Sequence, residues 1–436
     1  MQLGKQFFDR FSSRAISIAW PFAVLLFACF FYSAAWAQQD QEWIPESDLG
    51  TKQSAQSSGR RFADLFVNLR RSPATSSSQV QGNVALDHYH NGSFNSNLQW
   101  VVSGRVDLDS VPGAGLSANS LSLSLREAYL TAHIDALNVD IGRINIRDGV
   151  ALGYNPSDVF RSGSLLARRT EDPARLRESR LGVVGLQARY ATDVGNFSGL
   201  IAPKISVDNK KHWYDPQLGA VNGVDTQTYF KYTAPRWNDV YSSLVLHRSP
   251  ATGNTLGINS TGNIGQHIVA YIEYAKLKRT QLPNNVDGSL ALKRDYTQVA
   301  FGASYSTERR QTWTLEYQHN GAGLGTEQWR GDWQSASPAT LTSIVFDTLK
   351  RQDPLAKKSV MALLQWDQLL TADDDLTCLA RANLIDKSRL LWCEWRYKLP
   401  RSEWSMSGTR LVGAARSEFG AAATPWLLAA KLRLFY

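Results

Sequence analysis

Three polar side chains near the middle of the chain have the types and spacing of a surface that binds anions. Arg143, Asn145 and Arg147 alternate with two isoleucines, and this two-residue period places all three on one face of a strand. Between residues 158 and 180 the chain carries six arginines and four carboxylates. A guanidinium group pairs with carboxylate or phosphate through two parallel hydrogen bonds. The block predicts either a constriction loop that adds positive charge to a pore, or a solvated loop whose ion pairs contribute little.

Asn155, Pro156 and Asp158, followed by Arg161, form a compact motif inside this block. Asn and Asp side chains bond to nearby backbone, and Pro fixes one backbone dihedral, so the motif predicts a tight turn. We expect the turn to fold the loop back toward the strand that precedes it.

Basic residues also recur on the polar parity of other segments that alternate like strands. These further pore-lining candidates are Arg105, Arg126, Arg189, Arg381, Arg396, Lys398, Arg410, Lys431 and Arg433. Rings of Arg and Lys favour anions in a pore, and many exchangeable pairs would suit a uronic-acid polysaccharide, with Trp392 available to stack on sugar rings. The same face also holds Asp107, Asp367 and Glu394, as any water-filled lumen does. The pattern therefore allows an anion preference or a lumen without selectivity.

No group of residues has the spacing of a catalytic or metal site, so we predict no catalytic residues, no metal and no cofactor. The seven histidines are scattered, and the pair His88 and His90 has no cysteine or carboxylate at ligand spacing beside it. A hydrolase would need a Ser/His or Asp/His pair assembled across strands, and no local motif indicates one. The net charge of +8 would suit nucleic acid, but an exported barrel meets none, so we expect no such partner.

The last segment of the chain indicates what kind of element positions these residues. Apolar side chains fall on one parity, and Lys431 and Arg433 fall on the other. A two-residue period with one apolar and one charged face is typical of a barrel strand between lipid and a wet lumen. Because the segment ends on an aromatic, we expect Leu434 and Tyr436 to act as the signal read by the barrel assembly machinery.

Residues 1–37 have the three parts of a secretory signal peptide. Lys5, Arg10 and Arg14 precede an apolar run, and Ala35-Trp36-Ala37 forms a small-x-small cleavage site. An uncleaved membrane anchor is the alternative, because the run is long. No other stretch reaches the ~18 apolar residues of a membrane helix, so the exported chain is expected to be periplasmic, secreted or an outer-membrane barrel.

Residues 38–79 are predicted to be a polar segment with one short amphipathic helix. Phe62, Leu65, Phe66 and Leu69 recur at helical spacing. The helix would pack on the periplasmic rim of the barrel or enter the lumen as a plug.

Residues 80–436 are predicted to form one transmembrane antiparallel β-barrel of about 16–18 strands, so the fold class is all-β with a short N-terminal helix. Seventeen segments alternate like strands, although an even number is expected. Residues 149–179 and 321–358 are too long for turns and are expected to be functional loops. A soluble β-sandwich or solenoid is the competing fold. Aromatic residues near strand ends favour a membrane interface instead: Trp366, Trp395, Tyr397 and Tyr436.

Cys378 and Cys393 are the two cysteines outside the predicted signal peptide. Both lie on the outward parity of adjoining segments, and a four-residue loop from Leu384 to Lys387 would place them directly opposite each other. A cross-strand disulfide is one of several registers that the sequence allows in an oxidising compartment.

Short motifs resemble a family of Gram-negative outer-membrane barrels that groups alginate-exporter-like channels with porin-like proteins. The motifs are Arg126-Glu127-Ala128-Tyr129-Leu130, Gly142-Arg143-Ile144-Asn145, Asn155-Pro156-Ser157-Asp158, Glu316-Tyr317, Asn320-Gly321-Ala322-Gly323 and Ser417-Glu418-Phe419-Gly420. The resemblance extends over residues 120 to 436, and only the order of the motifs makes it specific. It departs from the family at Lys431, where such barrels often have glycine. The resemblance implies a barrel in the outer membrane of a Gram-negative bacterium.

We therefore predict a passive outer-membrane channel or export conduit for a polar, preferably anionic solute or polysaccharide, and not an enzyme. The alternatives are a non-selective porin and a structural or assembly barrel that anchors an envelope complex through its long loops. An outer-membrane lipid hydrolase ranks last. We expect contacts with outer-membrane lipid and lipopolysaccharide, and the sequence leaves the oligomeric state open.

Overall fold

The computed structural model describes residues 59–71, 78–110, 120–165, 170–205, 217–223, 225–250, 253–280, 293–421 and 425–436. The predicted signal peptide of residues 1–37 and the polar stretch up to residue 58 lie outside the described residues, so both stay predictions.

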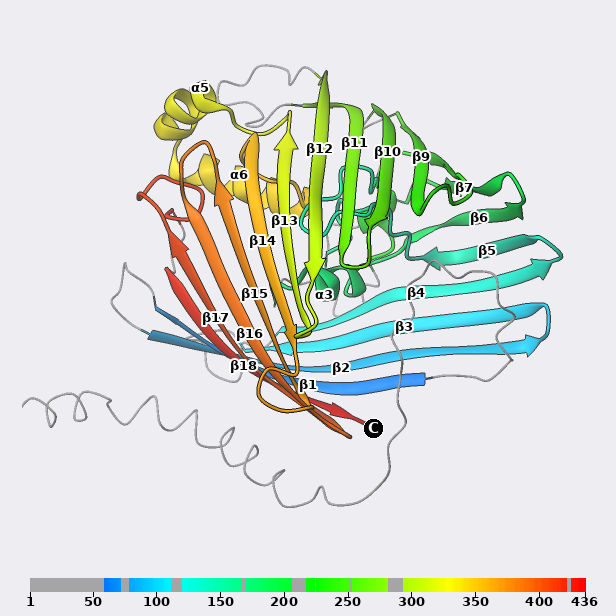
Figure 1. The fold of residues 1–436 in the computed structure, drawn as a ribbon, viewed down its shortest axis with the longest axis horizontal. Coiled ribbons are helices and arrows are strands. Elements are labelled where there is room, and N and C mark those ends of the chain that lie inside the picture. The colour runs from blue at the N-terminus through cyan, green and yellow to red at the C-terminus, as the bar shows by residue number, and fades with distance from the viewer. Residues whose placement is uncertain are drawn as a thin grey trace, which may run out of the picture. The chain divides into compact units, whose positions relative to one another are not determined.

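Eighteen strands form one closed antiparallel ring, in which each strand pairs with its neighbour in the chain and β18 pairs with β1 (Figure 1). This confirms the predicted barrel and its even number of strands. The strands are β1 Gly59–Arg71, β2 Ser78–Asn95, β3 Leu98–Asp109, β4 Ser120–Ile134, β5 Leu137–Ile144, β6 Val183–Thr192, β7 Gly195–Ala202, β8 Gln227–Thr233, β9 Val240–Ser249, β10 Gly253–Ile264, β11 Ile268–Thr280, β12 Lys293–Ser306, β13 Gln311–Asn320, β14 Lys358–Asp367, β15 Asp374–Asn383, β16 Arg389–Leu399, β17 Ser402–Val412 and β18 Trp426–Phe435.

The predicted N-terminal helix is wrong, because its residues form β1, the strand that closes the barrel. β1 pairs with β2 on one side and with β18 on the other, so its backbone groups find partners in two strands. Phe62, Asp64, Phe66 and Asn68 are buried on the inner face, and the odd-numbered residues between them face outward. Because this strand has apolar residues on both faces, Phe62, Leu65, Phe66 and Leu69 recur at intervals of three and four residues, which is also the spacing of a helix. Together with the seventeen predicted segments, β1 makes up the eighteen strands.

The two ends of the barrel differ in the length of their connections. Short turns join β2 to β3, β4 to β5, β6 to β7, β10 to β11 and β12 to β13, at the end where β1 begins and β18 ends. The opposite end carries the long connections, residues 145–182 between β5 and β6 and residues 321–357 between β13 and β14. Short turns at one end and long loops at the other are the pattern of outer-membrane barrels, in which the short turns are periplasmic.

The helices of the described residues lie in the long connections. They are α3 Pro173–Glu178, α4 Gly219–Asn222, α5 Thr326–Gln328, the π-helix η3 Trp329–Trp333 and α6 Pro338–Arg351. In the view of Figure 1, α5 and α6 lie at the top and the C-terminus lies below. Within the described ranges, no helix combines the length and apolar character needed to cross a membrane.

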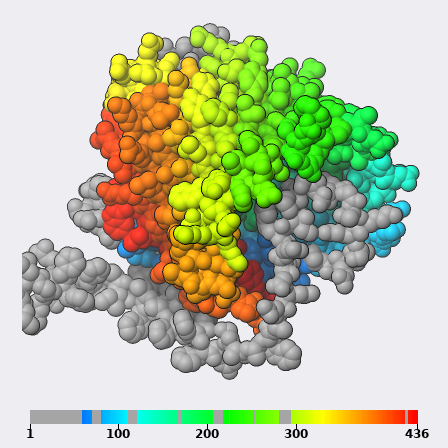
Figure 2. Space-filling model, in the orientation of Figure 1, coloured from blue at the N-terminus to red at the C-terminus, as the bar shows by residue number. Residues whose placement is uncertain are grey.

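The outer wall is apolar, with aromatic side chains near the short-turn end. Phe94, Trp237, Tyr305 and Trp313 are largely exposed there, as in an aromatic girdle at a membrane interface. Figure 2 shows the side chains of neighbouring strands packed into a continuous wall on the near face. The aromatic residues singled out in the sequence lie near the same end: Trp366, Trp395, Tyr397 and Tyr436.

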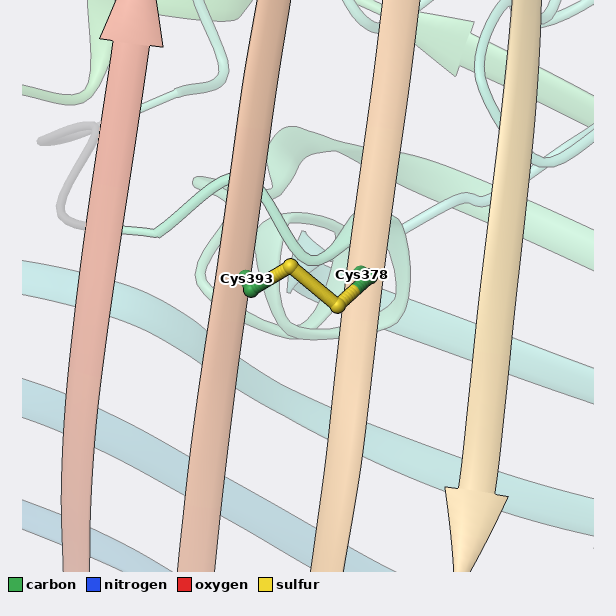
Figure 3. The surroundings of a disulfide bond; sticks show 2 residues. All are labelled: Cys378 and Cys393. Atoms are coloured by element: carbon green, nitrogen blue, oxygen red, sulfur yellow. A yellow bond between two sulfur atoms is a disulfide. The ribbon is translucent and has the colours of Figure 1, made fainter.

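The predicted disulfide is present. Cys378 of β15 and Cys393 of β16 lie directly opposite each other, with their Cα atoms 4.1 Å apart (Figure 3). Their chain neighbours Leu379 and Trp392 are buried inside, so the bond faces outward. The backbone N–H of Asn383 donates to the carbonyl of residue 388, which confirms the four-residue loop between the strands.

We expect no free thiol when the protein lacking residues 1–37 is denatured without reductant. After reduction two thiols should react. A closed loop of 15 residues contributes about 3 kcal/mol in the chain-entropy account, so the double variant Cys378→Ala, Cys393→Ala should unfold at lower urea in detergent. It should still assemble, because the ladder between β15 and β16 sets the register. Two titratable thiols in the unreduced protein would contradict the pairing.

Candidate functional site

The lumen loop, residues 145–182 between β5 and β6, folds into the barrel. The structure describes it except for residues 166–169. Its first half bonds to side chains of β11 and β13, and its helix α3 bonds to side chains of β16 and β17. The loop therefore crosses the interior instead of extending into solvent, as the constriction-loop interpretation predicts.

Glu273 of β11 is the first anchor of the lumen loop. One carboxyl oxygen accepts from the backbone N–H of Val150 at 2.5 Å and of Ala151 at 2.6 Å. The same oxygen accepts from the Asn155 side-chain amide at 3.1 Å. The other oxygen accepts from the backbone N–H of Ser157 at 3.2 Å and from its hydroxyl at 2.9 Å. Five donors converge on one fully buried side chain, so Glu273 fixes both the position and the turn of the loop.

Glu316 of β13 is the second anchor. One of its oxygens accepts from the backbone N–H of Leu152 at 2.9 Å and of Gly153 at 3.0 Å, and from the hydroxyl of Tyr271 at 2.9 Å. A Cβ added at Gly153 would collide with the sulfur of Met361, so the backbone approaches the wall here as closely as glycine allows. The two glutamates together hold four consecutive N–H groups against the wall.

The motif that begins at Asn155 makes the turn that the sequence predicts. The backbone N–H of Asp158 donates to the carbonyl of Asn155 at 3.2 Å, with Pro156 between them. Arg161 donates to the carbonyls of both Asn155 and Asp158, and the Asp158 carboxylate pairs with Arg180. All these side chains are buried, so the motif clamps the loop and does not face a solute.

Asp353, in the connection between β13 and β14, ties the two long loops together. Its carboxylate pairs with Arg161 at 2.6 Å and with Arg279 of β11. Burial alone would raise the pKa of Asp353, but the two guanidiniums lower it by more, so the pKa lies below the ordinary 3.8. Burial likewise opposes the charge on Arg161, and Asp353 outweighs it, which raises the pKa of Arg161 above its usual value. Both partners therefore stay ionised at neutral pH.

The helix α3 ties the lumen loop to another part of the wall. Asp172 caps the helix by accepting from the backbone N–H of Ala174 at 3.1 Å, and its other oxygen pairs with Arg396 of β16 at 3.0 Å. Arg175 within α3 pairs with Glu403 of β17 at 2.9 Å. Burial lowers the pKa of Arg175, but Glu403 raises it by more, so the pair stays charged.

Apolar packing supports the loop between these polar ties. Phe160 packs among Ile144, Val183 and Tyr229, and Leu152 packs against the cluster that contains Trp392. The loop is thus held to the wall by apolar as well as polar contacts.

A pocket of about 100 Å³, which we call the α3 gap, lies between α3 and the wall formed by β1–β4 and β16–β18. Its lining among the described residues includes six cations and five carboxylates. The cations are Arg60, Arg105, Arg126, Arg175, Lys431 and Arg433. The carboxylates are Asp64, Asp87, Asp107, Glu178 and Glu394. The gap is therefore densely charged, with a small excess of positive charge.

Most cations of the α3 gap are paired across strands. Asp64 of β1 pairs with Arg105 of β3 at 3.1 Å and with Arg433 of β18 at 2.8 Å. Asp87 of β2 pairs with Arg126 of β4 at 2.6 Å and with Arg105 at 3.5 Å. These carboxylates cancel much of the field that the basic residues alone would produce.

Most of the predicted pore-lining residues do lie on the inner face. They are Arg105, Arg126, Arg189, Arg381, Arg396, Lys398, Lys431 and Arg433. Arg189 is paired with Asp140 at 3.0 Å, and Lys398 with Asp375 at 2.7 Å. Asn145 and Arg147 belong to the lumen loop. The Arg147 guanidinium donates to the side-chain oxygen of Asn145 at 3.1 Å when the amide is oriented with that oxygen toward Arg147.

Arg143 does not line the pore, contrary to the sequence prediction. Its side chain is 2 % exposed, and its guanidinium donates to the carbonyls of Gly182 and Gln217 at 3.0 Å each. Asp140 and Ile144 occupy the inner parity of β5 instead. The prediction assumed that the charged parity faces the lumen, whereas backbone carbonyls of the long connections satisfy this buried arginine.

Arg410 was also wrongly assigned to the lumen. It shares the parity of Met406, which is 64 % exposed, whereas Glu403 and Ser405 on the other parity are buried inside. Its partner in the register is Trp426 of β18. Arg410 lies near the long-loop end of β17, and outer-membrane barrels tolerate charge on the outer face close to the strand ends.

The described residues bring together no group of three or more side chains that could hold a metal ion. His88 and His90 lie on the outer parity of β2, and the ring of His90 meets Trp100 edge-on at 5.1 Å between centroids. These two imidazoles belong to the outer wall of the barrel.

The sequence did not indicate that Glu273, Glu316 and Asp353 hold the lumen loop, although Glu316 belongs to one of the motifs that carry the family resemblance. Ala151 and its acceptor Glu273 are 122 residues apart in the chain, so no local pattern joins them. The available signal was weak: each glutamate is the single carboxylate on the inner parity of its strand.

Comparisons with known proteins agree with the fold. No protein-family model matches the chain, and no curated protein does. Acinetobacter baumannii OccAB1 has 11% identity and a TM-score of 0.55, covering 87% of this chain and 96% of that one. Pseudomonas aeruginosa OccK11 (OpdR) has 11% identity and a TM-score of 0.50, covering 87% and 95%. At these identities the likeness to solved outer-membrane porins shows the fold alone, and the alginate-exporter-like specificity stays a resemblance.

Proposed function

We propose that this chain is a passive channel in a Gram-negative outer membrane, rather than an enzyme, and that it admits small polar solutes with a modest preference for anions. The observation that carries the proposal is the α3 gap, a charged pocket beside a loop that is anchored inside the barrel. Six cations face five carboxylates there, so the field is positive but weak.

The lumen loop favours a small solute over a polysaccharide. It is fixed to β11 and β13 by the two buried glutamates and to β16 and β17 through α3. A polymer needs a continuous wide path, whereas a small ion needs only the gap that the loop leaves.

Neutralising two cations of the α3 gap tests the anion preference. Arg60 is exposed at the gap, and Lys431 is joined to Glu403 only through a 3.5 Å contact, so both can be replaced by Gln with little structural change. A unit charge acts on an ion ~8 Å away in water with about 0.5 kcal/mol. Its removal costs anions this attraction and relieves cations of the equal repulsion, so each replacement should lower the anion-to-cation permeability ratio about fivefold. Reversal potentials across a planar bilayer in a salt gradient measure this ratio, most clearly at low salt.

The matched control is the double variant Arg309→Gln, Arg310→Gln, which removes the same charge from an exposed short turn. It should leave the ratio unchanged. If both double variants insert and conduct with equal ratios, the α3 gap does not select ions. A wild-type barrel that inserts and never conducts would favour a structural or assembly role.

A further inference from the structure

Three cations face outward near the long-loop ends of β9 and β11. Arg248 lies on β9, and Lys276 and Lys278 lie on β11. Their chain neighbours His247 and Leu277 are buried inside, so the three side chains point away from the lumen. They do not belong to the α3 gap.

The strand register brings these cations to the two sides of β10. Arg248 of β9 lies opposite Asn254 of β10. Lys276 of β11 lies opposite Leu256, two residues further along β10. Adjacent strands are about 4.8 Å apart, so long side chains from β9 and β11 can reach one bound group above β10. A surface groove of about 470 Å³ lies at this place, lined among others by Thr228, Arg248, Asn254 and Lys276.

The floor next to the groove is apolar. Phe230, Leu246, Leu256 and Ile272 lie on the outer face, closer to mid-height of the barrel than the cations, and are exposed. Phe230, Leu246 and Leu256 are consecutive partners in the register of β8, β9 and β10. An anionic group held by the cations would therefore have an apolar surface directly beneath it.

The charge on this face is not balanced. Asp295 of β12, opposite Lys278 in the register, is the one carboxylate among the described residues that line the groove. Two cations, Arg248 and Lys276, line the groove, and Lys278 lies next to it opposite Asp295, so this face carries a net positive charge. Lysine and arginine at the edge of a membrane wall extend their ends to the headgroup level.

We propose that this face binds the phosphate-bearing headgroup of a glycolipid in the outer leaflet of the membrane. Arg248, Lys276 and Lys278 are the phosphate ligands, and Leu246 and Leu256 lie against the start of the acyl chains. The inference rests on the proposed outer-membrane location, in which the long-loop end faces outward. It does not depend on conduction, since the site is on the outer wall.

The test measures binding of phosphorylated lipid A, of its dephosphorylated counterpart and of inorganic pyrophosphate to the full barrel in detergent. We expect the wild type to bind phosphorylated lipid A, with affinity that falls as salt rises. The triple variant Arg248→Gln, Lys276→Gln, Lys278→Gln should bind it at least about tenfold more weakly, because each cation near such a surface contributes severalfold. Equal binding of the phosphorylated and dephosphorylated lipids would overturn the proposal.

The control variant is Arg61→Gln, Arg309→Gln, Arg310→Gln, which removes three exposed cations at the short-turn end. It should bind the lipid like the wild type. An equal loss in both triple variants would mean that net charge and not this face is responsible. If pyrophosphate competes at the same concentration as the lipid, the site holds a soluble anion and the apolar floor has no part in it. Should the triple variant fail to fold by gel mobility, the double variant Lys276→Gln, Lys278→Gln gives the same comparison.

Discussion

The variant Glu273→Ala is expected to release the lumen loop and to raise the single-channel conductance roughly twofold or more, with larger current noise. Five hydrogen-bond donors of the loop share this one acceptor. Hydrogen bonds contribute about 0.5–1.5 kcal/mol each, and about 1–3 kcal/mol is lost for every buried donor left without a partner. The loop should therefore leave the wall while the strand ladder persists, and a wider pore conducts more.

A matched control distinguishes release of the loop from general damage. Glu308 is exposed in the short turn between β12 and β13, and Glu308→Ala should leave conductance and noise unchanged. Glu316→Ala removes the second anchor and should act in the same direction as Glu273→Ala. If Glu273→Ala inserts normally, with its usual heat-dependent gel shift, and conducts like the wild type, then the loop does not constrict the pore.

The wall of the barrel could be predicted because its signal is local. The two-residue alternation identified seventeen of the strands, and the four-residue loop between β15 and β16 set the register of the disulfide. β1 was mistaken for a helix because Phe62 and Phe66 make its inner face apolar as well. Its pairing with β2 and with β18, the latter more than 350 residues away in the chain, makes this segment a strand and not a helix.

The interior could be predicted only in part, because its contacts are long-range. The sequence indicates that the motif at Asn155 turns and that arginines gather in the lumen. It does not indicate that Asp64 pairs with both Arg105 and Arg433, since these three residues come from β1, β3 and β18. The number of basic residues on the inner faces of the strands therefore overstates the positive field in the lumen, because carboxylates on other strands pair with many of them. The error at Arg143 has the same origin, because its acceptor Gln217 belongs to a distant connection.

The variant Asp353→Ala is expected to have the largest effect on stability of any single replacement in the long loops. It leaves Arg161 buried, with its ion-pair partner lost, and removing one partner of a buried pair costs about 3–5 kcal/mol. It also breaks the tie from the connection between β13 and β14 to Arg279 of β11. Urea unfolding in detergent should show a lower midpoint than for Asp332→Ala, which removes an exposed carboxylate from the same connection.

The stabilisation by Asp353 should also depend on pH. Since Arg279 and Arg161 lower its folded pKa below the ordinary 3.8 despite burial, its contribution is complete above that value. It is lost as pH falls through the still lower folded pKa, because protonation removes the charge that both guanidiniums require. The wild type should therefore keep its unfolding midpoint from pH 7 to about pH 5 and lose part of it below about pH 4. Asp353→Asn should start from the lower midpoint and lack this part of the acid loss. If the unfolding midpoints of the wild type and of Asp353→Asn fall in parallel through the acid range, then Asp353 does not join the two loops.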